Sequence, residues 1–61
     1  MNRAKRILRD MALAREYRYG VIDQATLARR HGLSQSQASK AIRNGRRWIA
    51  LLAAIERAKV E

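Results

Sequence analysis

The hydrophobic and polar positions follow a helical period along most of the chain. Over Asn2 to Tyr19 the apolar positions recur three and four residues apart, which is the spacing of one helix face. These positions are Ala4, Ile7, Leu8, Met11 and Ala14. A short second helix is predicted from Gln24 to about His31, with Leu27 and Ala28 facing inward.

Two further helices are predicted toward the C-terminus. The third begins at about Gln35 and ends at Arg43 or Asn44, and its inward positions are Ala38, Ala41 and Ile42. The last extends from Arg46 to about Val60 and carries two apolar stripes, Trp48/Leu51/Leu52/Ile55 and Ile49/Ala53/Val60. One stripe is enough to close a small core, so the second predicts a contact with another copy of the chain. We expect this dimer interface to use Trp48, Ile49, Leu52 and Ile55.

Capping residues and glycines set the predicted boundaries. Gly20, Gly32 and Gly45 each follow a helical stretch and are interpreted as helix stops at the left-handed position after the last turn. Asp23 is a predicted N-cap, and Ser34 with Gln37 fits a capping box. The chain is therefore predicted to be a single all-α domain of about four helices.

Residues 24–43 of this domain match a helix-turn-helix motif. Ala28 occupies the position where the two helices cross, and a larger side chain there would push them apart. Gly32 occupies the turn, where a positive φ is needed. Leu33 then fills the corner between the helices.

The charge of the chain indicates a polyanionic partner. The chain has fourteen Lys and Arg residues and only five Asp and Glu residues, which gives a formal net charge of +9. There are no cysteines, the carboxylates are scattered, and His31 is the only histidine. We therefore expect no enzymatic activity, no metal site and no cofactor, and a core this thin leaves no room for a small-molecule ligand.

Two further patterns bear on location. The most apolar run, Trp48 to Ile55, is too short to cross a bilayer. Residues 3–18 lack the continuous hydrophobic core of a signal peptide. A cytoplasmic location is expected.

The third predicted helix has the chemistry of a base reader. Gln35, Ser36, Ser39, Lys40 and Arg43 project outward from it, and their amide, hydroxyl and cationic groups can bond to base edges in the major groove. Arg46 and Arg47, just past Gly45, are predicted to contact phosphates, which supply salt-dependent affinity rather than sequence information.

The segment Gln24 to Trp48 resembles the Cro repressors of lambdoid phages. The matching residues are Gln24, Ala28, Gly32, Gln35-Ser36, Lys40-Ala41-Ile42 and Gly45-Arg46, and Leu8 to Ala12 resembles the first helix of that family. The resemblance implies base contacts by Gln35, Ser36, Ser39 and Lys40, and a phosphate contact by Gln24. Some members of the family continue into a β-hairpin, whereas Trp48 to Ile55 is predicted to be helical. A weaker resemblance to the plasmid repressor KorA, of the TrfB type, rests on Gln24-Ala25-Thr26, Gly32-Leu33 and Trp48.

Together these features predict a homodimeric repressor in a bacterial host that binds a palindromic operator in double-stranded DNA. Its half-sites would lie about one helical turn, roughly 34 Å, apart. The sequence also leaves two alternatives open. One is an architectural or excisionase-type factor that bends DNA, and the other is a cationic peptide that binds RNA or a membrane surface.

Overall fold

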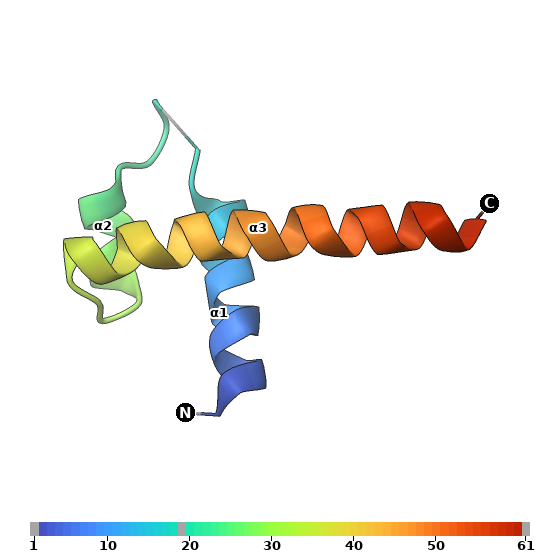
Figure 1. Ribbon diagram of the computed structural model, residues 1–61. Coiled ribbons are helices and arrows are strands. Elements are labelled where there is room, and N and C mark those ends of the chain that lie inside the picture. Colours follow the sequence, from blue (N-terminus) through green and yellow to red (C-terminus); the bar gives the residue numbers. More distant parts are fainter. Residues whose placement is uncertain (1, 19, 61) are drawn as a thin grey trace.

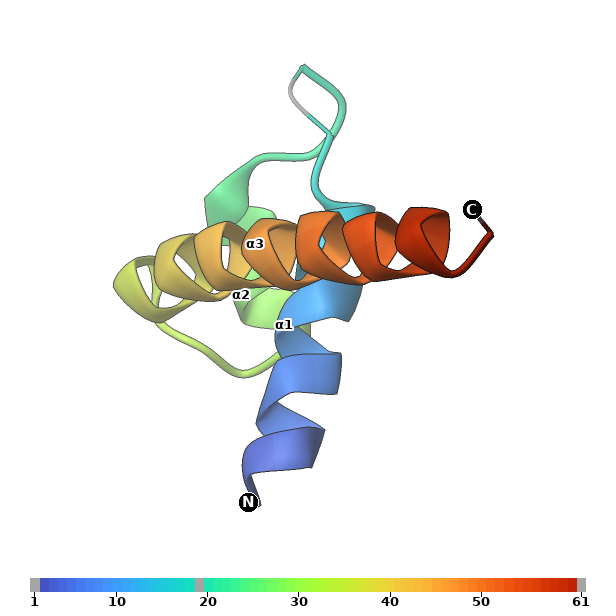
Figure 2. The same ribbon diagram turned by 45° about the vertical axis from the view of Figure 1, so that its right-hand side comes forward.

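The computed structural model describes residues 2–18 and 20–60, and within them the chain forms three α-helices and no strand. They are α1 (Arg3–Glu16), α2 (Gln24–Arg30) and α3 (Gln35–Val60). The N-terminal part of α3 lies beside α2, α1 crosses the middle of α3, and the C-terminal part of α3 projects beyond both (Figures 1 and 2). The all-α prediction is confirmed. The prediction of four helices is wrong, because the third and fourth are one continuous helix.

The helix boundaries follow from local capping bonds. The Asn2 side chain accepts a hydrogen bond of 2.8 Å from the backbone N–H of Lys5 and caps α1. Tyr17, with extended backbone, ends α1 earlier than the predicted end at Tyr19, which lies outside the described residues. Gly20 has the predicted positive φ of 82°, but it belongs to the turn after this end rather than to the helix cap itself.

Gly45 is the main departure from the predicted boundaries. It lies inside α3 and is buried where α1 crosses this helix. A Cβ built on Gly45 would lie 2.9 Å from the Cβ of Ala14 and closer still to the backbone carbonyl of Asp10. Gly45 therefore permits the two helices to approach each other and does not end one of them.

The core is small and lies between the three helices. Leu13, Leu27, Ala41 and Ile42 form one buried cluster, against which Tyr17, Ile22 and Leu33 pack. Met11, Ala28 and Ala38 are also buried. The inward positions predicted for α2 and for the N-terminal part of α3 are thus confirmed.

The predicted inner face of α1 was partly wrong. Leu13, which the spacing did not place on this face, is completely buried, whereas Leu8 is 65% exposed and Ala4 is also exposed. Met11 is buried, and Ile7 and Ala14 are half-buried. The face is rotated because α1 turns its Asp10–Ala14 side toward Gly45.

Residues 50–60 of α3 form a projecting segment that we call the arm. Every arm residue whose side chain is described, through Lys59, is exposed, and Leu51, Leu52 and Ile55 are each between 42% and 48% exposed. Val60, which the apolar pattern also included, has a side chain outside the described part. None of the helices in the described residues combines the length and apolarity needed to span a membrane.

Candidate nucleic-acid interface

The junction between α2 and α3 is held by hydrogen bonds that fix the direction of α3. The Asp23 carboxylate accepts a bond of 2.7 Å from the backbone N–H of Thr26 and caps α2, and this bond lowers the pKa of Asp23 from its usual value. Gly32 follows the end of α2 with a φ of 65°, as predicted. The backbone N–H of Leu33 then donates to the carbonyl of Ala28 at 2.8 Å, which closes the turn.

The predicted capping box at the start of α3 is confirmed. The backbone N–H of Gln37 donates to the Ser34 hydroxyl at 3.1 Å, and the backbone N–H of Ser34 donates to the Gln37 side chain at 2.9 Å. Because Gln37 is engaged in this way, its amide is not part of the free polar surface. The first turn of α3 is thereby rigidly defined and presents its neighbours Gln35 and Ser36 to solvent.

The five side chains predicted to read bases lie on the solvent side of α3. Gln35, Ser36, Lys40 and Arg43 are exposed, and Ser39 is half-buried. The chain has no carboxylate residue between Asp23 and Glu56, so this surface is purely polar and cationic. Such a surface attracts a polyanion and offers donors and acceptors to it.

One side of this surface is bounded by the N-terminus of α2. A hollow of about 410 Å³ brings Gln24 together with Ser39 and Arg43, and Tyr17, Ile42 and Arg46 also line it. The Arg46 guanidinium lies 5.6 Å from the centre of the Tyr17 ring, a distance typical of a cation–π contact. Gln24 and Arg46, both predicted to contact phosphates, therefore lie on the same side of α3.

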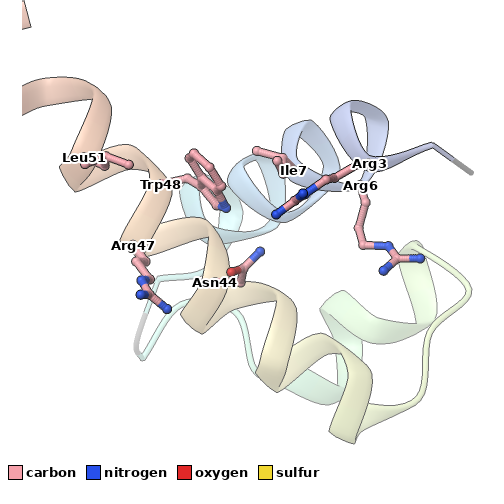
Figure 3. A pocket seen from close by; sticks show the side chains of 7 residues that line it. All are labelled: Arg3, Arg6, Ile7, Asn44, Arg47, Trp48 and Leu51. Atoms are coloured by element: carbon pink, nitrogen blue, oxygen red, sulfur yellow. The ribbon is translucent and has the colours of Figure 1, made fainter. Parts of the chain in front are cut away.

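Arg47, the third predicted phosphate-contacting residue, lies on the other side. It is exposed and lines a second hollow of about 410 Å³ where α1 crosses α3, together with Arg3, Arg6, Ile7, Asn44, Trp48 and Leu51. Figure 3 shows the Trp48 ring facing Ile7 and the Arg3 side chain extended toward Asn44, while Arg47 points away from α1. Arg46 and Arg47 thus line different hollows beside one helix, about 100° apart around it, and do not belong to a linker after it.

The crossing of α1 and α3 contains a buried polar group that the sequence did not reveal. The Asp10 carboxylate, only 4% exposed, accepts a hydrogen bond of 2.8 Å from the Asn44 amide and pairs with Arg9 at 3.2 Å. Asn44 and Gly45 therefore act together, one by bonding to α1 and the other by leaving room for it. The sequence carried no signal for this arrangement, because Asn44 and Gly45 are residue types that also cap helices.

Three basic residues whose roles the sequence left open are placed by the structure. His31 ends α2, and its Nε2 lies 2.8 Å from a carboxylate oxygen of Glu16, so it links α2 to the end of α1. Arg15 and Arg18 are exposed.

Among the described residues no group of three or more His, Cys, Asp and Glu side chains is placed to hold a metal ion.

The residues predicted to form a dimer interface fall into two groups. Leu52 and Ile55 are exposed on the arm, whereas Trp48 and Ile49 are half-buried near the crossing with α1. Leu51, which the sequence placed on the same stripe, is 48% exposed and extends the apolar part of the arm.

Comparison of the chain with protein-family models, with curated proteins and with solved structures finds no match.

Proposed function

We propose that the protein is a homodimeric, sequence-specific repressor that binds double-stranded DNA and places the N-terminal part of α3 in the major groove. The observation that carries this proposal is the α2–turn–α3 unit. Its turn is fixed by Gly32 and by the bond from Leu33 to Ala28, and it leaves Gln35, Ser36, Lys40 and Arg43 exposed on one surface. An α-helix with its side chains, about 10–12 Å across, matches the roughly 12 Å width of the major groove.

The chemistry of the exposed residues supports reading as well as attraction. Gln35 can bond to adenine through two atoms, Lys40 and Arg43 can donate to guanine, and Ser36 and Ser39 can serve either role. Gln24 and Arg46 would contact phosphates on one side of the groove and Arg47 on the other. The resemblance of residues 24–48 to Cro-type repressors agrees with these roles.

The dimer is the second part of the proposal. Leu51, Leu52 and Ile55 form an apolar stripe on the arm that is between 42% and 48% exposed, and a second arm is its simplest cover. A two-fold dimer would place two copies of α3 in successive turns of the major groove, about 34 Å apart. Repression would follow where such an operator overlaps a promoter.

The test is selection from a random duplex library at about 150 mM salt, where non-specific electrostatic attraction to DNA is weaker than at low salt. Recovery of an inverted repeat with half-sites one helical turn apart is expected. Recovery of no motif, or only of flexible base steps, would contradict the repressor proposal and favour a protein that bends DNA.

Two variants then separate reading from attraction on the recovered duplex. Gln35→Ala should cost about 1–3 kcal/mol at one base position and relax the preference there. Arg47→Ala should weaken binding to all sequences alike and reduce the slope of log affinity against log salt by about one for each subunit. Binding measured by fluorescence anisotropy over a salt series distinguishes the two, and identical behaviour of both variants would mean that α3 is not in the groove.

A further inference from the structure

The N-terminal half of α1 carries arginines that the proposed function does not use. Arg3 and Arg6 lie on the wall of the hollow at the helix crossing, opposite Arg47 on α3 (Figure 3). Arg6 also lines an adjoining hollow with Lys40 and Gln37, next to the predicted base-reading surface. The cations of α1 are therefore continuous with the surface of α3.

These arginines carry charge that the described part of the chain does not neutralise. The ion pairs among the described residues are Arg9–Asp10 and His31–Glu16, and neither involves Arg3, Arg6 or Arg47. The buried Asp10 is already occupied by Arg9 and by the Asn44 amide. The hollow thus presents guanidinium groups to solvent, beside the apolar surface of Ile7, Trp48 and Leu51.

The position of the hollow relative to α3 indicates what it binds. A helix seated in the major groove has a sugar–phosphate backbone along each of its two sides, because the groove is only about 12 Å wide. Gln24 and Arg46 border α3 on one side, whereas Arg3 and Arg6 border it on the other. Guanidinium groups bond to phosphate oxygens through two N–H groups at once.

We infer that Arg3 and Arg6, with Arg47, form a second phosphate-binding surface that holds the DNA strand opposite to the one contacted by Gln24. This inference rests on the proposed function, since it assumes that α3 lies in the groove. The two surfaces together clamp α3 between the strands. The crossing of α1 over α3, fixed by Gly45 and by the Asp10–Asn44 bond, sets the distance between them.

The experiment uses the selected duplex with single neutral methylphosphonate linkages placed in turn along each strand. For the wild-type chain, affinity should fall at two groups of phosphates in each half-site, one on each strand. Arg3→Gln/Arg6→Gln should lose its sensitivity to one group and Gln24→Ala to the other. The double variant removes two contacts from each subunit, so it should also flatten the salt slope by about 3.6 for the dimer, since each phosphate contact contributes about 0.9.

Lys5→Gln is the matched control, because Lys5 is an exposed cation of α1 that does not line the hollow. It should leave the methylphosphonate pattern unchanged. Arg3→Lys/Arg6→Lys keeps both charges and should retain most of the slope. Far-UV circular dichroism shows whether each variant is folded, and substitutions of exposed residues normally change stability by no more than about 0.5 kcal/mol.

The outcomes separate the inference from the proposed function. If the double variant behaves like Lys5→Gln while Gln24→Ala and Gln35→Ala keep their own effects, the second surface does not exist and the repressor proposal stands. If the wild-type chain fails to bind any duplex, both are overturned. If the double variant loses its sensitivity to one of the two groups of phosphates in each half-site, the inference is established.

Discussion

The two parts of α3 belong to one continuous helix and meet different surroundings. Residues 35–49 pack against α1 and α2 and contribute Ala38, Ala41 and Ile42 to the core. In the arm, residues 50–59 are all exposed, and the helix projects beyond α1 and α2 after Leu51, which still lines the hollow at the crossing (Figure 1). Tertiary packing therefore stabilises the first part as a helix. The second part depends for its helical structure on its Ala and Leu residues, which favour helices, and on its continuity with the first part.

The largest difference between the two parts of α3 is expected when an isoleucine in each part is replaced by alanine. Ile42 is 3% exposed and Ile55 is 44% exposed, so Ile42→Ala removes core contacts that Ile55→Ala does not. Ile42→Ala should lower the free energy of unfolding by about 2–5 kcal/mol. Ile55→Ala should lower it by about 0.5 kcal/mol or less in the monomer. Urea denaturation followed by circular dichroism at low protein concentration measures both.

Equal losses in the two variants, independent of protein concentration, would contradict the comparison. They would mean that the arm folds back onto its own chain in solution. A loss for Ile55→Ala that grows with concentration would instead point to association through the arm.

A smaller effect is expected at the point where the two parts meet. In an ordinary helix, Gly→Ala stabilises by about 0.5–1 kcal/mol. At Gly45 the added methyl would press on the backbone of Asp10 and on Ala14, so Gly45→Ala should instead destabilise by about 1–3 kcal/mol. Thermal unfolding of this variant gives the sign directly.

Ala54→Gly in the arm is the control for Gly45→Ala, because it tests helix propensity where nothing crosses the helix. It should reduce helix content at the C-terminus at a local cost of about 1 kcal/mol without changing the unfolding of the core. A stabilising Gly45→Ala would show that α1 does not cross α3 at this residue.

The sequence predicted what short-range chemistry determines. Asp23, Gly32 and the Ser34–Gln37 pair act within a few residues, so their pattern was enough to place α2, the turn and the start of α3. The residues predicted to read bases were placed on the exposed surface for the same reason, since the inward positions of α3 were predicted correctly.

The sequence did not predict what depends on two distant segments meeting. A glycine that ends a helix and a glycine that lets another helix approach look alike in one sequence, and Gly45 was the second kind. The buried Asp10 was missed because its partner, Asn44, lies on another helix. For the same reason a helical wheel could not show that Leu13 is buried and Leu8 exposed, because the rotation of α1 is set by where it crosses α3.

The smallest effect on the stability of the folded monomer is expected from a substitution at Leu52, which also tests the proposed dimer. Leu52 is 42% exposed, so Leu52→Glu places a carboxylate where solvent already reaches and should change monomer stability by about 0.5 kcal/mol or less. In a dimer that packs two arms together, the same change would bury an unpaired charge on each side of the interface, and the dimer should dissociate.

Sedimentation over a concentration series separates these results, with Ala53→Glu on the other stripe of the arm as control. Dissociation by Leu52→Glu alone would identify the Leu51/Leu52/Ile55 stripe as the interface. A dimer that survived this substitution would have to form elsewhere, and the arm would then be free to serve another partner.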